Sequence, residues 1–211
     1  MKKIDGGLYL VLDPSKEKTM LLNQLSAALN GGVKVLQIWN NWRRGMLQDD
    51  KVLLINEIIK LAKHFSVPVL INEEWELLKH TELNGAHFDS VPTSLDQIKR
   101  DVGRDISIGI TCGNNIELVK WADDHKVDYI SFCSIYPSKS AGSCEIVSPV
   151  TIQKANELTN IPIFVSGGIT PENLLQLEGL GVDGVAVISG ILESKTPKKS
   201  SFAYIQSLNK I

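Results

Sequence analysis

Two glycine-containing turns near the C-terminus decide the fold: residues 165–173 are VSGGITPEN and residues 185–190 are VAVISG. Each turn follows an apolar run, and glycines let backbone N–H groups approach an anion closely. Thr170 followed by Pro171 favours a helix over residues 171–180, whose positive end would add to the attraction. Together the turns predict a cradle for a phosphate monoester. The simpler alternative is two tight turns that hold no ligand.

The rest of the chain alternates short apolar runs with amphipathic stretches of helix length. Runs rich in Val and Ile are typical of parallel strands that helices cover. The pattern predicts eight strands, over residues 8–13, 33–39, 67–72, 85–89, 107–112, 128–134, 161–167 and 184–189. It predicts helices over residues 19–30, 50–65, 94–100, 114–125, 149–158, 171–180 and 200–208.

Two architectures accommodate this alternation, a closed (β/α)₈ barrel and a doubly wound open sheet. The open sheet usually carries a glycine-rich phosphate loop after its first strand, but here Asp13 and Pro14 stand in that place. Barrels commonly bind phosphate after their seventh and eighth strands. We therefore predict an α/β fold, a single (β/α)₈ TIM-barrel domain over residues 1–211.

The composition limits the classes of partner that we expect this chain to bind. Hydrophobic residues make up 43% of the chain and the formal net charge is −2, which gives no sign of nucleic-acid or membrane binding. Three cysteines without framework spacing argue against a disulfide scaffold. We find neither a signal peptide nor an apolar run long enough to span a bilayer. We expect a cytoplasmic protein that binds small phosphate substrates. The sequence leaves open whether it forms a homo-oligomer.

Several stretches resemble thiamine phosphate synthase and its relative, the thiazole tautomerase, over nearly the whole length. The most specific are GGITPEN at residues 167–173 and GVDGVAVIS at residues 181–189. LYLV at residues 8–11, GGVKVLQ at residues 31–37 and IYPS at residues 135–138 also match. The resemblance implies a TIM-barrel fold and a condensation reaction that uses Mg²⁺ as cofactor. In that reaction hydroxymethylpyrimidine diphosphate is joined to a thiazole phosphate and pyrophosphate is released.

The resemblance also implies a division of the site. Its pyrimidine and diphosphate half would use Gln37, Trp39, Asn41, Asn72 and Thr111. The thiazole-phosphate half would use Ser138, Ser140, Gly167, Gly168, Ile188 and Ser189. Lys139 and Glu73 would be catalytic, with Glu73 the better candidate for Mg²⁺ and Asp89 a weaker one.

The sequence departs from the family in the diphosphate half. Trp39 and Asn41 replace two cations, and Glu73 replaces an aspartate. Trp39 would either stack on a heteroaromatic ring or fill the emptied diphosphate pocket.

Further along, Pro92 replaces a metal-binding aspartate, and Lys139 comes two residues earlier than its counterpart. Gly113 replaces a histidine found in many members, including the tautomerase. A diphosphate cannot be desolvated without replacement charge, so Arg43, Arg44 and Lys139 are candidate substitutes. The alternative is that the two arginines form a solvated loop pair.

Three functions compete. The first is a thiamine phosphate synthase with a rebuilt diphosphate clamp. The second is a non-synthase member, tautomerase-like or regulatory, that binds a thiazole phosphate or thiamine phosphate without condensing anything. The third is a phosphate-sugar isomerase on the same fold. His87 is predicted to be a hydrogen-bonded barrel residue rather than a catalyst, and His64, His80 and His125 to be surface residues.

Overall fold

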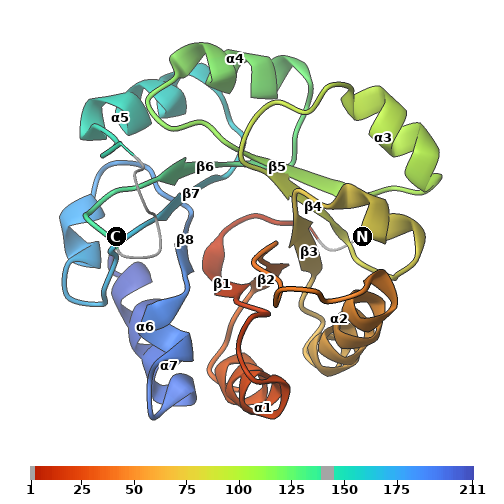
Figure 1. Cartoon of the computed structure of the whole chain (residues 1–211). Coiled ribbons are helices and arrows are strands. Elements are labelled where there is room, and N and C mark those ends of the chain that lie inside the picture. The colour runs from red at the N-terminus through yellow and green to blue at the C-terminus, as the bar shows by residue number, and fades with distance from the viewer. Residues whose placement is uncertain (1–2, 139–144) are drawn as a thin grey trace.

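The chain forms a closed barrel of eight parallel strands in sequence order (Figure 1), in a computed structural model that describes residues 3–138 and 145–211. Each strand pairs with its neighbours in sequence, and β8 returns to pair with β1. The predicted fold class is therefore confirmed. The strands are β1 (Gly7–Leu12), β2 (Val35–Ile38), β3 (Val69–Asn72), β4 (Gly85–Phe88), β5 (Ser107–Thr111), β6 (Tyr129–Cys133), β7 (Ile163–Ser166) and β8 (Gly184–Val187).

The helices form an outer ring around these strands (Figure 1). No helix in the described ranges is long and apolar enough to cross a membrane. The α-helices are α1 (Lys18–Leu29), α2 (Gln48–Lys63), α3 (Leu95–Val102), α4 (Ile116–Asp124), α5 (Pro149–Leu158), α6 (Ser189–Leu192) and α7 (Pro197–Leu208). Two 3₁₀ helices follow β3 and β7, namely η1 (Trp75–Lys79) and η2 (Leu174–Leu177).

The helix predicted over residues 171–180 is wrong, because only the short η2 forms there. Thr170 and Asn173 exchange side-chain-to-backbone hydrogen bonds in the pattern of a helix capping box, but only the single short 3₁₀ segment follows them. Gly179 and Gly181 then adopt positive φ angles of 76° and 68°, which end helical structure. The expected α-helical N-terminus beside the β7 turn is therefore absent from this described segment.

The barrel has two apolar layers. The larger lies between strands and helices, and includes Leu10, Ile55 and Ile130. The smaller fills the interior of the barrel with side chains that include Tyr9, Tyr129 and Phe164. Because successive side chains on a strand point to opposite faces, a single strand supplies both layers. The inner aromatic layer forms the floor on which the site rests.

Candidate active site

A cavity of about 410 Å³ lies at the carboxyl ends of the strands, where barrels place their active sites. Every strand contributes at least one residue to its lining. The residues expected from the sequence that line the cavity are Gln37, Trp39, Asn72, Asp89, Thr111, Ser138, Gly167, Gly168, Ile188 and Ser189. The two predicted halves of the site therefore face the same space.

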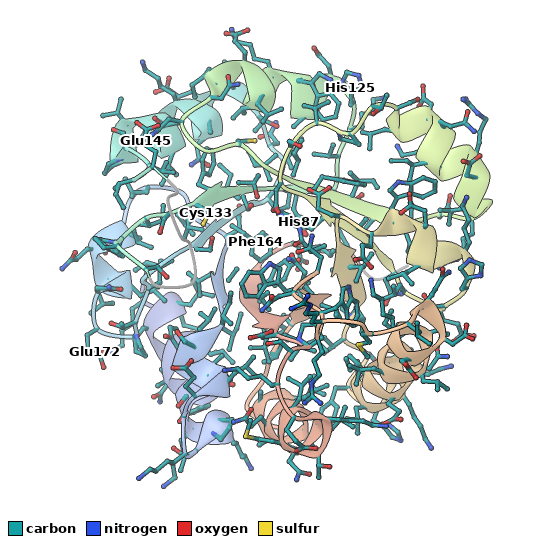
Figure 2. All side chains as sticks on the ribbon, viewed as in Figure 1. His87, His125, Cys133, Glu145, Phe164 and Glu172 are labelled. Carbon is teal, nitrogen blue, oxygen red and sulfur yellow. The ribbon has the colours of Figure 1, made fainter. Side chains whose placement is uncertain are left out.

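Three aromatic rings form the floor. Tyr9 meets Tyr129 edge-on at 5.8 Å and Phe164 at 5.5 Å between ring centroids. Glycines make room for these rings: a Cβ on Gly109 would lie 2.0 Å from Tyr129 Cζ, and one on Gly184 would lie 2.3 Å from Phe164 Cε1. Figure 2 shows Phe164 and His87 near the centre of the barrel, whereas His125 lies at its outside. Tyr129 and Phe164 also meet edge-on at 5.3 Å, so each ring packs against the other two.

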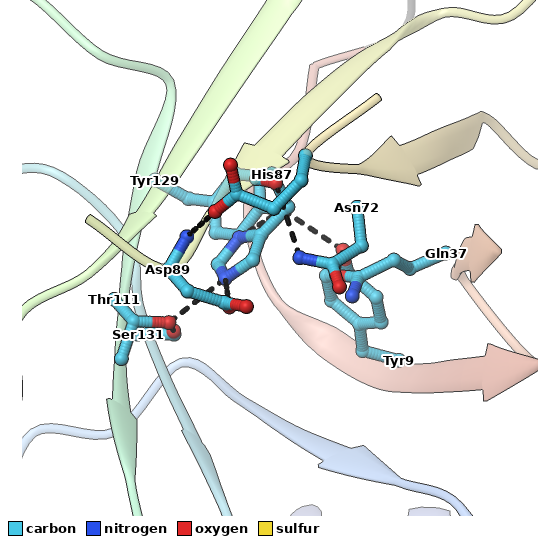
Figure 3. A network of polar contacts seen from close by, with 9 residues as sticks. Tyr9, Gln37, Asn72, His87, Asp89, Thr111, Tyr129 and Ser131 are labelled. Carbon is cyan, nitrogen blue, oxygen red and sulfur yellow. Dashed lines mark hydrogen bonds and ion pairs between the residues drawn. The ribbon is translucent and has the colours of Figure 1, made fainter. Parts of the chain in front are cut away.

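A chain of polar contacts lies on this floor (Figure 3). Tyr9 Oη donates a hydrogen bond to Gln37 Oε1 at 2.7 Å and lies 2.8 Å from Tyr129 Oη. His87 Nδ1 lies 2.9 Å from Tyr129 Oη, and His87 Nε2 lies 2.9 Å from Thr111 Oγ1. Burial raises the pKa of both Tyr9 and Tyr129, so both phenols stay protonated.

His87 is neutral at neutral pH. Burial lowers the pKa of its imidazole from 6.5 to about 4, and the negative charge of Asp89 opposes this only in part. Asp89 Oδ1 lies 4.0 Å from His87 Nε2. The side chain is buried and hydrogen-bonded at both nitrogens, as the sequence led us to expect, but it also lines the cavity.

The glycine turn after β7 is held closely by the loop after β6. The backbone N–H of Tyr136 donates to Gly167 O at 3.0 Å, and Ser134 Oγ donates to Tyr136 O at 2.6 Å. Gly167 and Gly168 have φ angles of 90° and 63°, which favour glycine. Asn173 Nδ2 donates to Gly168 O at 2.9 Å. These contacts fix the direction of the peptide groups in the turn.

The loop that follows Ser138 carries two predicted site residues, Lys139 and Ser140, which lie outside the described residues. Ser138 itself lines the cavity. The roles of Lys139 and Ser140 therefore stay predictions from the sequence.

The loop after β2 turns its polar groups toward the loop after β1. Asn41 Nδ2 donates to Asp13 Oδ1 at 3.0 Å, and it does not line the cavity. Arg43 donates from Nε to Ser15 O at 3.1 Å and from Nη2 to Lys16 O. Arg44 is exposed and does not line the cavity either. The structure thus does not bring these three side chains to the site, whereas half-buried Trp39 does line it.

The two predicted metal ligands lie side by side. Glu73 Oε1 accepts a hydrogen bond from the backbone N–H of Asp89 at 2.6 Å. Burial raises the pKa of Glu73, and the charge of Asp89 raises it further, against the opposing effect of that hydrogen bond. Asp89 lines the cavity, but Glu73 borders a neighbouring groove with Pro92. Within residues 3–138 and 145–211, no group of three His, Cys, Asp or Glu side chains could hold a metal ion.

Several lining residues escaped the sequence analysis. Strand alternation was the available signal, because residues two apart on a strand share a face. Tyr129 lies two residues before Ser131 on β6, and both point inward. The missed residues are Tyr9, Val11, Tyr129, Ser131, Cys133, Phe164 and Ala186. Ser166, Ile169, Val187 and Gly190 also line the cavity, and they belong to the two glycine turns predicted from the sequence.

A family model described as thiamine monophosphate synthase matches residues 8–191. The chain belongs to this family. Thiamine monophosphate synthase membership also agrees with curated relatives. The thiamine-phosphate synthase of Methanobrevibacter smithii is 28% identical over 95% of this chain and 94% of its own length. That of Marinobacter nauticus is 31% identical over 90% of this chain and 84% of its own length.

Solved structures share the fold. The thiamine phosphate pyrophosphorylase from Pyrococcus furiosus superposes with a TM-score of 0.82, at 18% identity, over 98% of this chain and 96% of that one. The thiamine monophosphate synthase family is one of transferases, and membership supports a function in thiamine biosynthesis. The resemblance drawn from the glycine turns is thereby confirmed.

Proposed function

We propose that this protein joins hydroxymethylpyrimidine diphosphate to a thiazole phosphate, giving thiamine phosphate and pyrophosphate. One observation carries the proposal: Gln37, Asn72 and Thr111 face the same cavity as the glycine turns after β7 and β8. Its volume of about 410 Å³ suits small-molecule ligands. A condensation needs both reactants in one space with their reacting atoms in contact.

In this reaction the thiazole nitrogen bonds to the methylene carbon of the pyrimidine. The bond from that carbon to the diphosphate oxygen breaks, and pyrophosphate leaves with the electron pair. We assign the pyrimidine to Gln37, Thr111 and Trp39, and the thiazole phosphate to the turns at Gly168 and Ser189 together with Ser138. Asn72 and Lys139 would contact the leaving diphosphate, and Ser140 would add a hydroxyl to the phosphate.

We propose that the polar and acidic residues after β3 and β4 would hold a magnesium ion. Asn72, Glu73 and Asp89 offer oxygen atoms, which Mg²⁺ prefers, and Mg²⁺ is commonly held by one or two carboxylates plus substrate phosphates. Burial and, to a smaller extent, the charge of Asp89 raise the pKa of Glu73, and a cation bound between the two carboxylates would relieve their repulsion. When bound, the ion would neutralise charge on the leaving diphosphate.

Glu73→Gln is expected to raise the Mg²⁺ concentration for half-maximal activity about tenfold. The amide oxygen can still accept the Asp89 N–H, so the change removes charge and keeps the contact. The measurement is a Mg²⁺ titration of pyrophosphate release. Glu76→Gln, an exposed change on η1, is the matched control. An unaltered Mg²⁺ requirement in Glu73→Gln would remove this residue from the metal site.

The reaction itself is tested with purified protein, both substrates and Mg²⁺. Thiamine phosphate and pyrophosphate should form in equal amounts. Complete absence of thiamine phosphate, in protein whose melting temperature the thiazole phosphate raises, would refute the synthase proposal.

A second candidate function is binding without condensation. It is favoured by the loop after β2, where Asn41 and Arg43 are engaged with the loop after β1 rather than with the cavity. Ligands that bind the native state raise its melting temperature. The synthase is expected to be stabilised by each substrate separately. Stabilisation by the thiazole phosphate alone, with none by the diphosphate, would support the second candidate instead.

A further inference from the structure

Six side chains from five strands join end to end across the cavity floor (Figure 3). They run from Gln37 on β2 through Tyr9, Tyr129, His87 and Thr111 to Ser131 on β6. The last contact joins Thr111 Oγ1 and Ser131 Oγ at 3.0 Å. All six residues line the cavity, so the order of their hydrogen atoms determines what the cavity offers a ligand.

The direction of the first bond fixes all the others. A hydroxyl group has one hydrogen, and Tyr9 gives its hydrogen to Gln37 Oε1. Tyr129 must therefore donate to Tyr9 in their 2.8 Å contact. Tyr129 then has no hydrogen left for His87, so the hydrogen of the neutral imidazole lies on Nδ1 and points at Tyr129.

Counting hydrogens in the same way orders the remaining contacts, from His87 to Ser131. With its hydrogen on Nδ1, His87 accepts at Nε2, so Thr111 donates to it across 2.9 Å. Ser131 must then donate to Thr111. Every hydrogen bond in this series therefore points the same way, with each donor on the Ser131 side and each acceptor on the Gln37 side.

We propose that these six side chains act as one ordered chain that fixes the Gln37 amide and thereby selects the heteroaromatic ring that binds. Within the described residues, Gln37 Nε2 has no partner, so it presents a donor to the cavity, while Ser131 Oγ presents an acceptor. An aminopyrimidine, with an acceptor ring nitrogen and a donor amino group, matches this pattern. Tyr9, Tyr129 and His87 are positioning residues that act through the two ends. This step rests on the proposed function for the identity of the ring.

The Tyr9→Phe variant reverses the order. Without the Tyr9 hydroxyl, a Tyr129 hydrogen pointing that way would be buried without a partner, which is unfavourable. Tyr129 can instead donate to His87 Nδ1, which moves the imidazole hydrogen to Nε2 and lets it donate to Thr111. Each buried hydrogen then again has an acceptor. Because Thr111 now donates to Ser131, the Ser131 hydroxyl presents its own hydrogen to the cavity.

The test is the tautomer of His87 in ligand-free protein, read by long-range ¹H–¹⁵N correlation after histidine-specific ¹⁵N labelling. The chain has four histidines, and His64, His80 and His125 are exposed. Replacing these three by Gln leaves a single imidazole to observe. The expected result is a hydrogen on Nδ1, shifting to Nε2 in Tyr9→Phe.

Tyr204→Phe is the matched control. It also removes a buried tyrosine hydroxyl, which donates to Ile169 O at 2.9 Å but takes no part in the chain. It should leave the hydrogen of His87 on Nδ1. The proposal would be overturned if the His87 hydrogen lay on Nε2 in protein that keeps Tyr9. It would also be overturned if Tyr9→Phe did not move the hydrogen from Nδ1.

Ligand selection is measured by calorimetry with the aminopyrimidine alcohol and its oxo counterpart, whose ring N–H would meet the Gln37 donor. At least about 100-fold weaker binding of the oxo ring is expected, and a smaller ratio in Tyr9→Phe. Equal binding of both rings would overturn the selection. The tautomer is measured without substrate, so its result is independent of the condensation. If thiamine phosphate forms but the His87 hydrogen lies on Nε2, only the ordered hydrogen-bond series is refuted.

Discussion

Gly167→Ala is expected to reduce kcat/KM at least about 100-fold and to lower the free energy of unfolding by about 2–4 kcal/mol. A Cβ there would lie 1.9 Å from Ser134 Oγ and 2.9 Å from Ser134 Cα, so the backbone of the β6 loop would have to move. That loop carries Ser138 and donates the Tyr136 N–H to Gly167 O. Both the turn and the loop would shift away from the proposed phosphate site.

The matched control is Gly179→Ala. Gly179 has a φ of 76°, so an alanine there meets similar backbone strain, but nothing lies within 4 Å of the added Cβ. It is expected to lose only about 1–2 kcal/mol of stability and to keep its activity. The measurements are denaturant unfolding and steady-state kinetics. Equal kinetic losses in the two variants would show that the close contact with Ser134 does not matter for the site.

The stability of the protein is expected to fall by about 3 kcal/mol as the pH drops from about 6.5 to 4 through His87 alone. Burial lowers the pKa of its imidazole from 6.5 to about 4. The unfolded chain therefore binds this proton at a higher pH than the folded chain does. The contribution is fully present above pH 6.5 and is lost progressively as the pH falls toward 4.

The measurement is denaturant unfolding at pH 7 and at pH 4.5, in EDTA so that no metal ion binds near Asp89. His87→Gln should remove this part of the pH dependence, whatever its own stability at pH 7. His125→Gln, which changes an exposed residue stacked on Trp121, should leave the pH dependence as in the unaltered protein. An unchanged pH dependence in His87→Gln would show that the folded protein accepts a proton on His87 without loss.

The order of strands and the positions of the two glycine turns were predictable from sequence. Short apolar runs separated by helix-length stretches indicate an α/β alternation, and glycines after the seventh and eighth runs favour the barrel. The ends of the elements were less accurate: the run at residues 33–39 contains the shorter strand β2 (Val35–Ile38). Strand ends are set by pairing partners, which a single run does not reveal.

The failed helix after β7 has a local cause that the apolar pattern hid. Leu174 and Leu177 are buried at helical spacing, so the run had the expected periodicity. The hydrogen bonds between Thr170 and Asn173 are those of a helix start, so they do not explain the loss. The positive φ angles of Gly179 and Gly181 end the segment after a few residues, and these glycines were the available signal for a short element.

By itself the sequence determined the barrel, the family and most of the residues that line the cavity, because these depend on periodicity and on short motifs. Only the tertiary structure decided where Asn41 and Arg43 point, because their partners, Asp13 and Ser15, belong to another loop. It also decided the series of hydrogen bonds from Gln37 to Ser131, in which Tyr9 contacts Tyr129 across a sequence separation of 120 residues. Barrel closure brings β1 and β6 onto one floor, and no local pattern in the sequence encodes that meeting.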